Sequence, residues 1–158
     1  LLHQEVLNLR ELMQQMRPVD VAPKRFLDYL ATTVDRFGRD VGISARFVSP
    51  FDEVAIPPRT CTEVARIVQE ALANIRKHSH ARSVLVRFDA QDDHWRLIID
   101  DDGRGFDFAG RLTQSELDAA HKGPMMIRER VRSIGGELVV ESGPGSGARL
   151  EITFPRKA

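Results

Sequence analysis

Four polar side chains share one face of a predicted helix. Glu70, Asn74, Lys77 and His78 follow one another at steps of four, three and one residues, beside the apolar stripe of that helix. An amide and a carboxylate one turn apart offer the oxygen ligands that Mg²⁺ prefers, and a lysine one turn further suits a phosphate. Taken alone, this spacing is also typical of a solvated helix face with an i,i+4 polar pair.

A second cluster, residues 101–106, follows a predicted strand with the sequence DDGRGF. A carboxylate at a strand end can accept a hydrogen bond from a purine amine, and glycines two and four residues later let the backbone approach a flat ring. An EF-hand is excluded because Ile98 stands where an oxygen ligand would be required four residues before Asp102. A plain acidic turn remains the alternative.

The third cluster combines a helix start at residues 123–126 with a glycine-rich stretch at 143–147. Free amides and the dipole at a helix start favour phosphate, whereas the second stretch is also typical of a hairpin turn. The chain contains no P-loop and no G-x-S-x-G nucleophile elbow. Zinc is not expected, because His78 and His80 are the only close histidine pair and Cys61 is distant from both.

Apolar spacing, glycine and proline predict the elements that position these clusters. The expected helices cover residues 1–16, 23–41, 59–78 and 123–134. The expected strands cover residues 43–48, 84–88, 95–99, 137–141 and 150–154. Residues 106–122 are polar and lid-like, with Thr113 and Glu116 forming a capping box for a short helix. Helices mixed with hairpins, without regular βαβ alternation, favour a two-layer α/β (α+β) sandwich over a doubly wound sheet.

Composition limits the class of protein further. The 158 residues suit one domain with a short appended element, and 23 basic residues balance 23 acidic ones. A neutral chain has no global attraction for nucleic acid or anionic lipid, so no nucleic-acid partner is expected and any polyanion must be held locally. The single Cys61 allows no internal disulfide, which suits the cytoplasm. The chain begins without Met and is expected to be part of a longer protein, which can be membrane-anchored.

The order and spacing of the clusters resemble the ATP-binding catalytic domain of sensor histidine kinases. Residues 68–79 resemble their N box, 101–106 the first glycine box, 123–130 the second and 143–155 the third. The pattern is most similar to the kinases paired with response regulators of the LuxR/NarL type. Residues 1–20 resemble the end of the dimerisation and phosphoacceptor hairpin, and residues 21–158 resemble the catalytic domain.

The resemblance implies a Bergerat ATP-binding fold, a mixed, mostly antiparallel sheet covered on one face by helices, with ATP and Mg²⁺ as cofactors. It implies that Asp101 bonds the adenine amine and that Gly103 and Gly105 border the ring. Asn74 would hold Mg²⁺, and Glu70 would be the acid/base residue.

The phosphate side follows from the same resemblance. Lys77 and His78 would contact phosphate oxygens, and residues 106–122 would be the ATP lid. Gly123 and the amides after it, beginning at Met125, would cradle the phosphates, with Gly147 of the third box also at the nucleotide.

Two departures from the family pattern concern affinity. Pro124 has no N–H to donate, and Ala148 replaces a Thr hydroxyl that commonly serves the adenine pocket. A lost neutral hydrogen bond costs about 0.5–1.5 kcal/mol, so ATP binding is expected to be weakened but real.

The implied reaction transfers the γ-phosphate of ATP to a histidine of the hairpin, in a dimeric kinase that serves a downstream response regulator. That histidine lies upstream of residue 1, and His3 is interpreted as a helix-surface residue. Residues 1–158 alone are therefore expected to bind ATP without autophosphorylation. The alternatives are a module that senses ATP or ADP without chemistry and an anti-sigma-type serine kinase of the same fold; the gyrase and mismatch-repair branches lack support because their other domains are absent.

Overall fold

The computed structural model describes residues 2–16 and 21–156. Its helical segments are α1 (Leu2–Met16), η1 (Pro23–Arg25), α2 (Phe26–Val41), α3 (Pro58–Asn74), η2 (Ile75–Ser79), α4 (Gln114–Ala120) and α5 (Met125–Ser133). Its strands are β1 (Ser44–Val48), β2 (Ser83–Gln91), β3 (His94–Asp101), β4 (Gly110–Thr113), β5 (Glu137–Gly143) and β6 (Gly147–Pro155).

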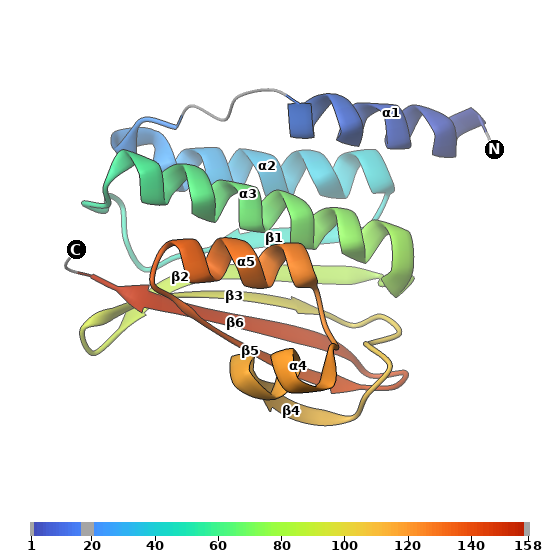
Figure 1. The fold of residues 1–158 in the computed structure, drawn as a ribbon. Helices are drawn as coiled ribbons and strands as arrows, with labels where there is room; N and C mark the ends of the chain where they lie inside the picture. Colours follow the sequence, from blue (N-terminus) through green and yellow to red (C-terminus); the bar gives the residue numbers. More distant parts are fainter. Residues whose placement is uncertain (1, 17–20, 157–158) are drawn as a thin grey trace.

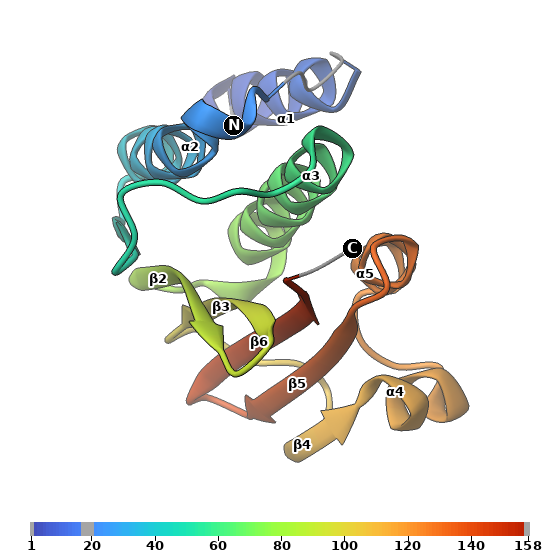
Figure 2. The ribbon, with the colours of Figure 1, turned by 90° about the vertical axis from the view of Figure 1, so that its left-hand side faces the viewer.

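The strands form one sheet in the order β1-β2-β3-β6-β5-β4. Only β1 and β2 run parallel, and the other neighbours are antiparallel. Helices α2, α3 and α5 cover one face of this sheet, and α1 lies on the outer side of α2 and α3 (Figures 1 and 2). The expected two-layer sandwich with a mixed, mostly antiparallel sheet is confirmed.

The core lies between the helical layer and the inner face of the sheet. The alternating residues of β2 and β3 and the apolar stripes of α2 and α3 are buried there, as their periods of two and about 3.6 require. Phe26 of α2 meets Phe88 of β2 edge to face, with ring centroids 5.3 Å apart. Gly42, the glycine directly after the helix expected over residues 23–41, ends α2 in the left-handed conformation at φ 81°.

Two local structures differ from the sequence-based expectation. The helix expected over residues 59–78 becomes π-helical after Asn74, and this π-turn, η2, ends before His80 at φ 54°. The expected lid contains an edge strand, β4, which pairs with β5. Only Leu112 is apolar in these four residues, so no alternation reveals the strand. The expected capping box is confirmed: Thr113 and Glu116 each accept from the other's backbone N–H at the start of α4.

Helix α1 contacts the rest of the molecule mainly through polar side chains. Arg10 pairs with Asp40 of α2 at 3.2 Å, and Arg76 of η2 donates to Asn8 at 2.7 Å. Leu7 is buried, whereas Val6, Leu9, Leu12 and Met13 are exposed. Arg17 and Pro18, whose sequence predicts the end of this helix, lie outside the described residues.

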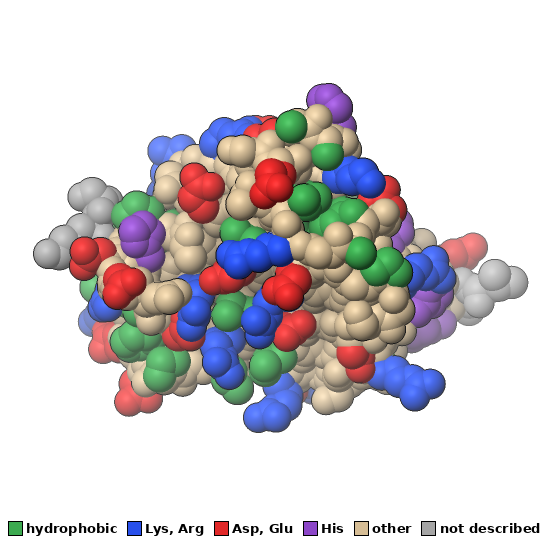
Figure 3. Space-filling model, turned by 90° about the horizontal axis from the view of Figure 1, so that it is seen from below, with side chains coloured by type: hydrophobic (Ala, Val, Ile, Leu, Met, Phe, Trp, Pro, Cys, Tyr) green, Lys and Arg blue, Asp and Glu red, His purple; other side chains and the backbone are tan. Residues whose placement is uncertain are grey.

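The face seen from below carries acidic and basic side chains close together, without a large area of one sign (Figure 3). Two pairs of this kind join neighbouring strands: Arg96 with Asp89 at 2.8 Å, and Arg149 with Asp100 at 3.5 Å. Among the described helices, none combines the length and the apolar character that crossing a membrane requires.

Candidate nucleotide-binding site

A pocket of about 830 Å³ opens where the end of α3, η2, the turn after β3, the segment before α5 and the β5–β6 turn meet. Six of the residues predicted from sequence line it: Asn74, Lys77, His78, Asp101, Gly105 and Gly123. Pro124 and Ala148, the two departures from the family pattern, line it as well. The structure therefore brings three sequence clusters, with lining residues from Asn74 to Gly145, to one cavity.

Asp101 is held at the end of β3 by two donors to the same oxygen. The Ser79 hydroxyl donates to Oδ1 at 2.7 Å, and the Gly103 N–H donates to Oδ1 at 2.8 Å. Ser79 is itself fixed, because its carbonyl accepts from the Arg104 N–H at 2.6 Å. The π-turn and the acidic glycine turn are thus tied together at the pocket wall.

The glycines of this wall make close backbone contacts. A Cβ on Gly103 would overlap Ser79, and a Cβ on Gly147 would overlap the Asp101 carbonyl. Gly105 adopts φ +81°, and a Cβ there would lie 2.9 Å from the Gly143 carbonyl oxygen. Gly103 and Gly147 are not among the residues that line the cavity, and the absence of a Cβ at each lets its walls approach.

The neighbouring carboxylate, Asp102, faces away from the pocket. Its Oδ1 accepts from the backbone N–H groups of Arg82 and Ser83 at 2.8 and 2.9 Å, and its Oδ2 accepts from the Ser83 hydroxyl at 3.0 Å. The Ser83 and Arg82 amides lower the pKa of Asp102, because they stabilise the charged carboxylate. Of the two adjacent aspartates, Asp102 joins strand ends and Asp101 remains available to the pocket.

Other lining residues of the pocket are suited to phosphates. Asn74, Lys77 and His78 reach it from the end of α3 and from η2, and His121 and Lys122 reach it from the segment before α5. Lys122 lies 3.9 Å from Asp107 across the lid segment. The cationic side chains can neutralise the charge of a polyanion in the pocket, and the neutral donors can hydrogen-bond to it. The chain as a whole has zero net charge and exerts no global attraction on a polyanion.

The donor set fits Mg²⁺ in the way this ion usually binds nucleotides. No group of three His, Cys, Asp or Glu side chains suited to a metal exists among the described residues. Asn74 nevertheless brings an amide oxygen to the pocket, and Mg²⁺ commonly takes one or two protein oxygens and completes its shell with phosphates and water.

Glu70 is directed toward α5 instead of the pocket. Its Oε1 accepts from Arg130 Nε at 2.8 Å, and Arg130 Nη1 also donates to Glu63 Oε2 at 3.2 Å. The Glu70 side chain is only 11% exposed and is not part of the pocket lining. Because an Arg partner occupies it, this carboxylate joins α3 to α5. Met125, also predicted at the site, has its side chain 64% exposed and outside the lining.

Several lining residues were not singled out from the sequence. Ser79, Arg104, Phe106, His121 and Lys122 all contribute to the wall. Phe106 stacks on Phe108 with centroids 5.8 Å apart, and its N–H donates to the Ser142 hydroxyl at 2.7 Å. Ser79 could have been noted as the last polar residue of the helix that carries Asn74, but nothing local predicts that it reaches Asp101.

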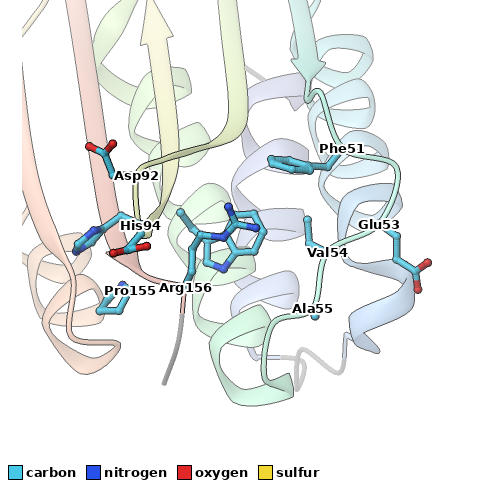
Figure 4. A pocket seen from close by; sticks show the side chains of 10 residues that line it. Phe51, Glu53, Val54, Ala55, Asp92, His94, Pro155 and Arg156 are labelled. Atoms are coloured by element: carbon cyan, nitrogen blue, oxygen red, sulfur yellow. The ribbon is translucent and has the colours of Figure 1, made fainter.

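A second pocket, of about 840 Å³, lies at the other end of β3 and β6 (Figure 4). Its aromatic wall is already covered, because the Arg156 guanidinium lies 4.2 Å from the Trp95 ring centroid. Glu53, Asp92 and Asp93 surround it. Three carboxylates beside one arginine do not suit a triphosphate, so the first pocket is the candidate nucleotide site.

Comparisons with known proteins agree with this geometry. The family model of the "Histidine kinase-, DNA gyrase B-, and HSP90-like ATPase" matches residues 61–158, and the chain belongs to this family of ATP-binding domains. The sensor histidine kinase LiaS of Bacillus subtilis (strain 168) is 30% identical over 147 residues, covering 93% of this chain and 39% of that protein. The histidine-protein kinase/phosphatase DegS of Brevibacillus brevis is 29% identical over 147 residues, covering 93% of this chain and 36% of that protein.

The fold has a counterpart among solved structures. The histidine kinase domain of the Erythrobacter litoralis EL346 blue-light activated histidine kinase superposes with a TM-score of 0.64 at 22% identity, covering 87% of this chain and 66% of that one. The family match and the sequence relatives confirm the resemblance to sensor histidine kinases predicted from the motifs. The chain spans about two fifths of the length of the curated relatives described above.

Proposed function

We propose that this chain binds Mg·ATP and delivers its γ-phosphate to a histidine on the dimerisation hairpin of a sensor kinase. In this proposal residues 1–20 are the end of a hairpin helix and residues 21–158 are the catalytic domain. The observation that carries the proposal is the convergence of Asp101, Asn74 and Lys77 on one pocket in a chain of this ATPase family.

The proposed roles follow from the chemistry of each side chain. Asp101 accepts a hydrogen bond from the adenine amine, with Gly103 and Gly105 giving the ring close access to backbone. Asn74 supplies an oxygen to Mg²⁺, which would neutralise charge on the phosphates. Lys77 and His78 contact phosphate oxygens, and Gly123 with the amides from Met125 onward closes the cradle. Such a site works mainly by positioning and charge neutralisation.

Glu70 is proposed as the acid/base residue for the acceptor imidazole. Its carboxylate is paired with Arg130 and does not line the pocket in this structure. To act on the imidazole, Glu70 would have to exchange Arg130 for the acceptor when the hairpin docks. The full protein would be a dimer that passes the phosphoryl group to a response regulator of the LuxR/NarL type, and it can be anchored at the membrane.

Calorimetric titration with ATP and Mg²⁺ tests the binding step. We expect Asp101→Ala to lower the affinity for ATP by about 100-fold, because it loses a charge-assisted hydrogen bond. We expect Asn74→Ala to remove most of the increase in ATP affinity that Mg²⁺ provides, because it loses a ligand to the metal. Asp93→Ala, an exposed carboxylate in the β2–β3 turn, is the matched control and should bind normally. Unchanged affinity in a folded Asp101→Ala variant would contradict the proposal.

A second candidate function is a nucleotide sensor without chemistry. Pro124 and Ala148 favour it, because both line the pocket, Pro124 has no N–H to donate and Ala148 has no side-chain donor. Supplying the hairpin histidine in cis separates the two functions. Transfer of label from γ-labelled ATP supports the kinase, and tight binding without transfer supports the sensor. Label on a serine of an added protein would instead indicate a serine kinase of the same fold.

A further inference from the structure

One oxygen of Asp101 is fully engaged by the protein and the other is not. Oδ1 accepts from both the Ser79 hydroxyl and the Gly103 N–H, at 2.7 and 2.8 Å. Within residues 2–16 and 21–156, Oδ2 accepts no hydrogen bond, and Asp101 lines the pocket. Two donors on one oxygen fix the rotation of the carboxylate, so the remaining oxygen has a defined direction.

Ser79 is unusually well placed to impose that direction. It is 8% exposed and ends the π-turn η2, and its carbonyl accepts from the Arg104 N–H. Gly103 leaves no Cβ between Ser79 and the turn, since a Cβ there would overlap the serine hydroxyl. Backbone and side chain of Ser79 therefore hold opposite ends of the same glycine turn.

We propose that Ser79 is the positioning residue that makes this pocket selective for 6-aminopurines, by fixing the Asp101 carboxylate so that Oδ2 faces the amino group. This inference rests on the proposed function, which it deepens. A carboxylate oxygen only accepts hydrogen bonds, so it attracts a 6-amino group and repels the 6-oxo group of guanine or hypoxanthine. Without Ser79, a single amide holds Asp101, and the direction of Oδ2 is lost.

The test compares two nucleotides that differ only at position 6. ATP has the 6-amino group, and purine riboside triphosphate has hydrogen there. With the wild-type chain and Mg²⁺, ATP should bind more tightly than the analogue. Ser79→Ala should weaken ATP by about tenfold, as expected for a charge-assisted hydrogen bond. The same change should alter the affinity for the analogue less than about twofold, because the analogue makes no contact that depends on Oδ2.

Two further variants separate positioning from general stability. Ser79→Thr keeps the hydroxyl and should restore the preference for ATP. Ser83→Ala removes the equivalent hydroxyl from Asp102, which faces away from the pocket, and should leave the preference unchanged. Thermal unfolding of each variant checks that the fold is retained.

Each result decides between the two claims. An equal loss for both nucleotides in Ser79→Ala, or no loss for either, overturns the role of Ser79 while leaving ATP binding intact. Wild-type chain that binds neither nucleotide overturns the proposed function itself. A loss confined to ATP, restored by Ser79→Thr, supports the inference.

Discussion

The two halves of the pocket are built differently. The base half consists of strand ends and glycine turns joined by short hydrogen bonds, from Ser79 to Asp101, from Arg104 to Ser79 and from Gly145 to Arg104. The phosphate half is formed by Asn74 at the end of α3, by Lys77 and His78, and by the segment before α5. There Lys122 and Asp107 are 3.9 Å apart, and Met125 and Met126 are 64% and 66% exposed.

This difference indicates that the two halves contribute differently to nucleotide binding. The base half is preorganised, so little ordering is needed when a purine enters. The phosphate half depends on how α5 is held against α3, and Arg130 provides a polar link between these helices through Glu63 and Glu70. Variants in the base half should therefore change recognition of adenosine, whereas variants around α5 should change recognition of its phosphates.

The largest effect is expected from adding one methyl group to the base half. Gly147→Ala places a Cβ against the Asp101 carbonyl, whereas Gly145→Ala has no atom within 4 Å of the new Cβ. Both glycines have positive φ, so alanine introduces similar backbone strain at each position. Only the alanine at position 147 also introduces a steric clash. We expect Gly147→Ala to reduce the free energy of unfolding by about 1–3 kcal/mol more than Gly145→Ala.

Chemical denaturation gives the stability difference, and adenosine binding to the surviving fold gives the recognition difference. Adenosine affinity should fall in Gly147→Ala and persist in Gly145→Ala. Equal behaviour of the two variants would mean that the base half is not rigid at this contact.

A smaller effect is expected from cutting the link between α3 and α5. Arg130→Met leaves Glu63 and Glu70 without their shared partner. The free energy of unfolding should fall by about 1–2 kcal/mol, because the two ion pairs of Arg130 are only partly buried. The affinity for ATP should fall severalfold while that for adenosine is retained. Nucleotide titrations of this variant and of the more exposed Arg132→Met measure both effects.

Replacing Glu70 in the same background sharpens this test. Arg130→Met combined with Glu70→Gln removes the more buried of the two unpaired charges and should recover part of the stability. Loss of adenosine binding in Arg130→Met would contradict the division between the two halves.

The smallest effect is expected at the start of α5. Pro124 lines the pocket and precedes Met125, and its ring nitrogen cannot donate. Pro124→Ala adds one N–H and should strengthen ATP binding by about threefold, as for one neutral hydrogen bond, without changing adenosine binding. Pro144→Ala is the control, because it adds an N–H in the β5–β6 turn and not at the start of α5. Isothermal titration of both variants against ATP and adenosine distinguishes them.

Sequence reasoning went furthest where local chemistry decides the structure. The apolar stripe of α2, its glycine stop and the Thr113 capping box needed no distant partner, and all are confirmed. Six residues that line the pocket were also predicted from the sequence, because the N box and the glycine boxes keep their order and spacing. Ser79 and Glu70 show the limit: helical spacing puts Glu70 near the face of Asn74, but packing of α5 brings Arg130, sixty residues away, to its carboxylate. Likewise, η2 was missed because no residue pattern distinguishes a π-turn from the α-helix that precedes it.

That π-turn makes the length of its segment matter as well as its composition. A π-turn holds one residue more than an α-turn, and four of the five residues in this one, Ile75, Lys77, His78 and Ser79, line the pocket. If one residue between 75 and 79 were deleted, the chain could continue as an ordinary α-helix, with one residue fewer in the turn that lines the pocket. We therefore expect deletion of a single codon here to impair nucleotide binding, as replacement of the lining side chains would.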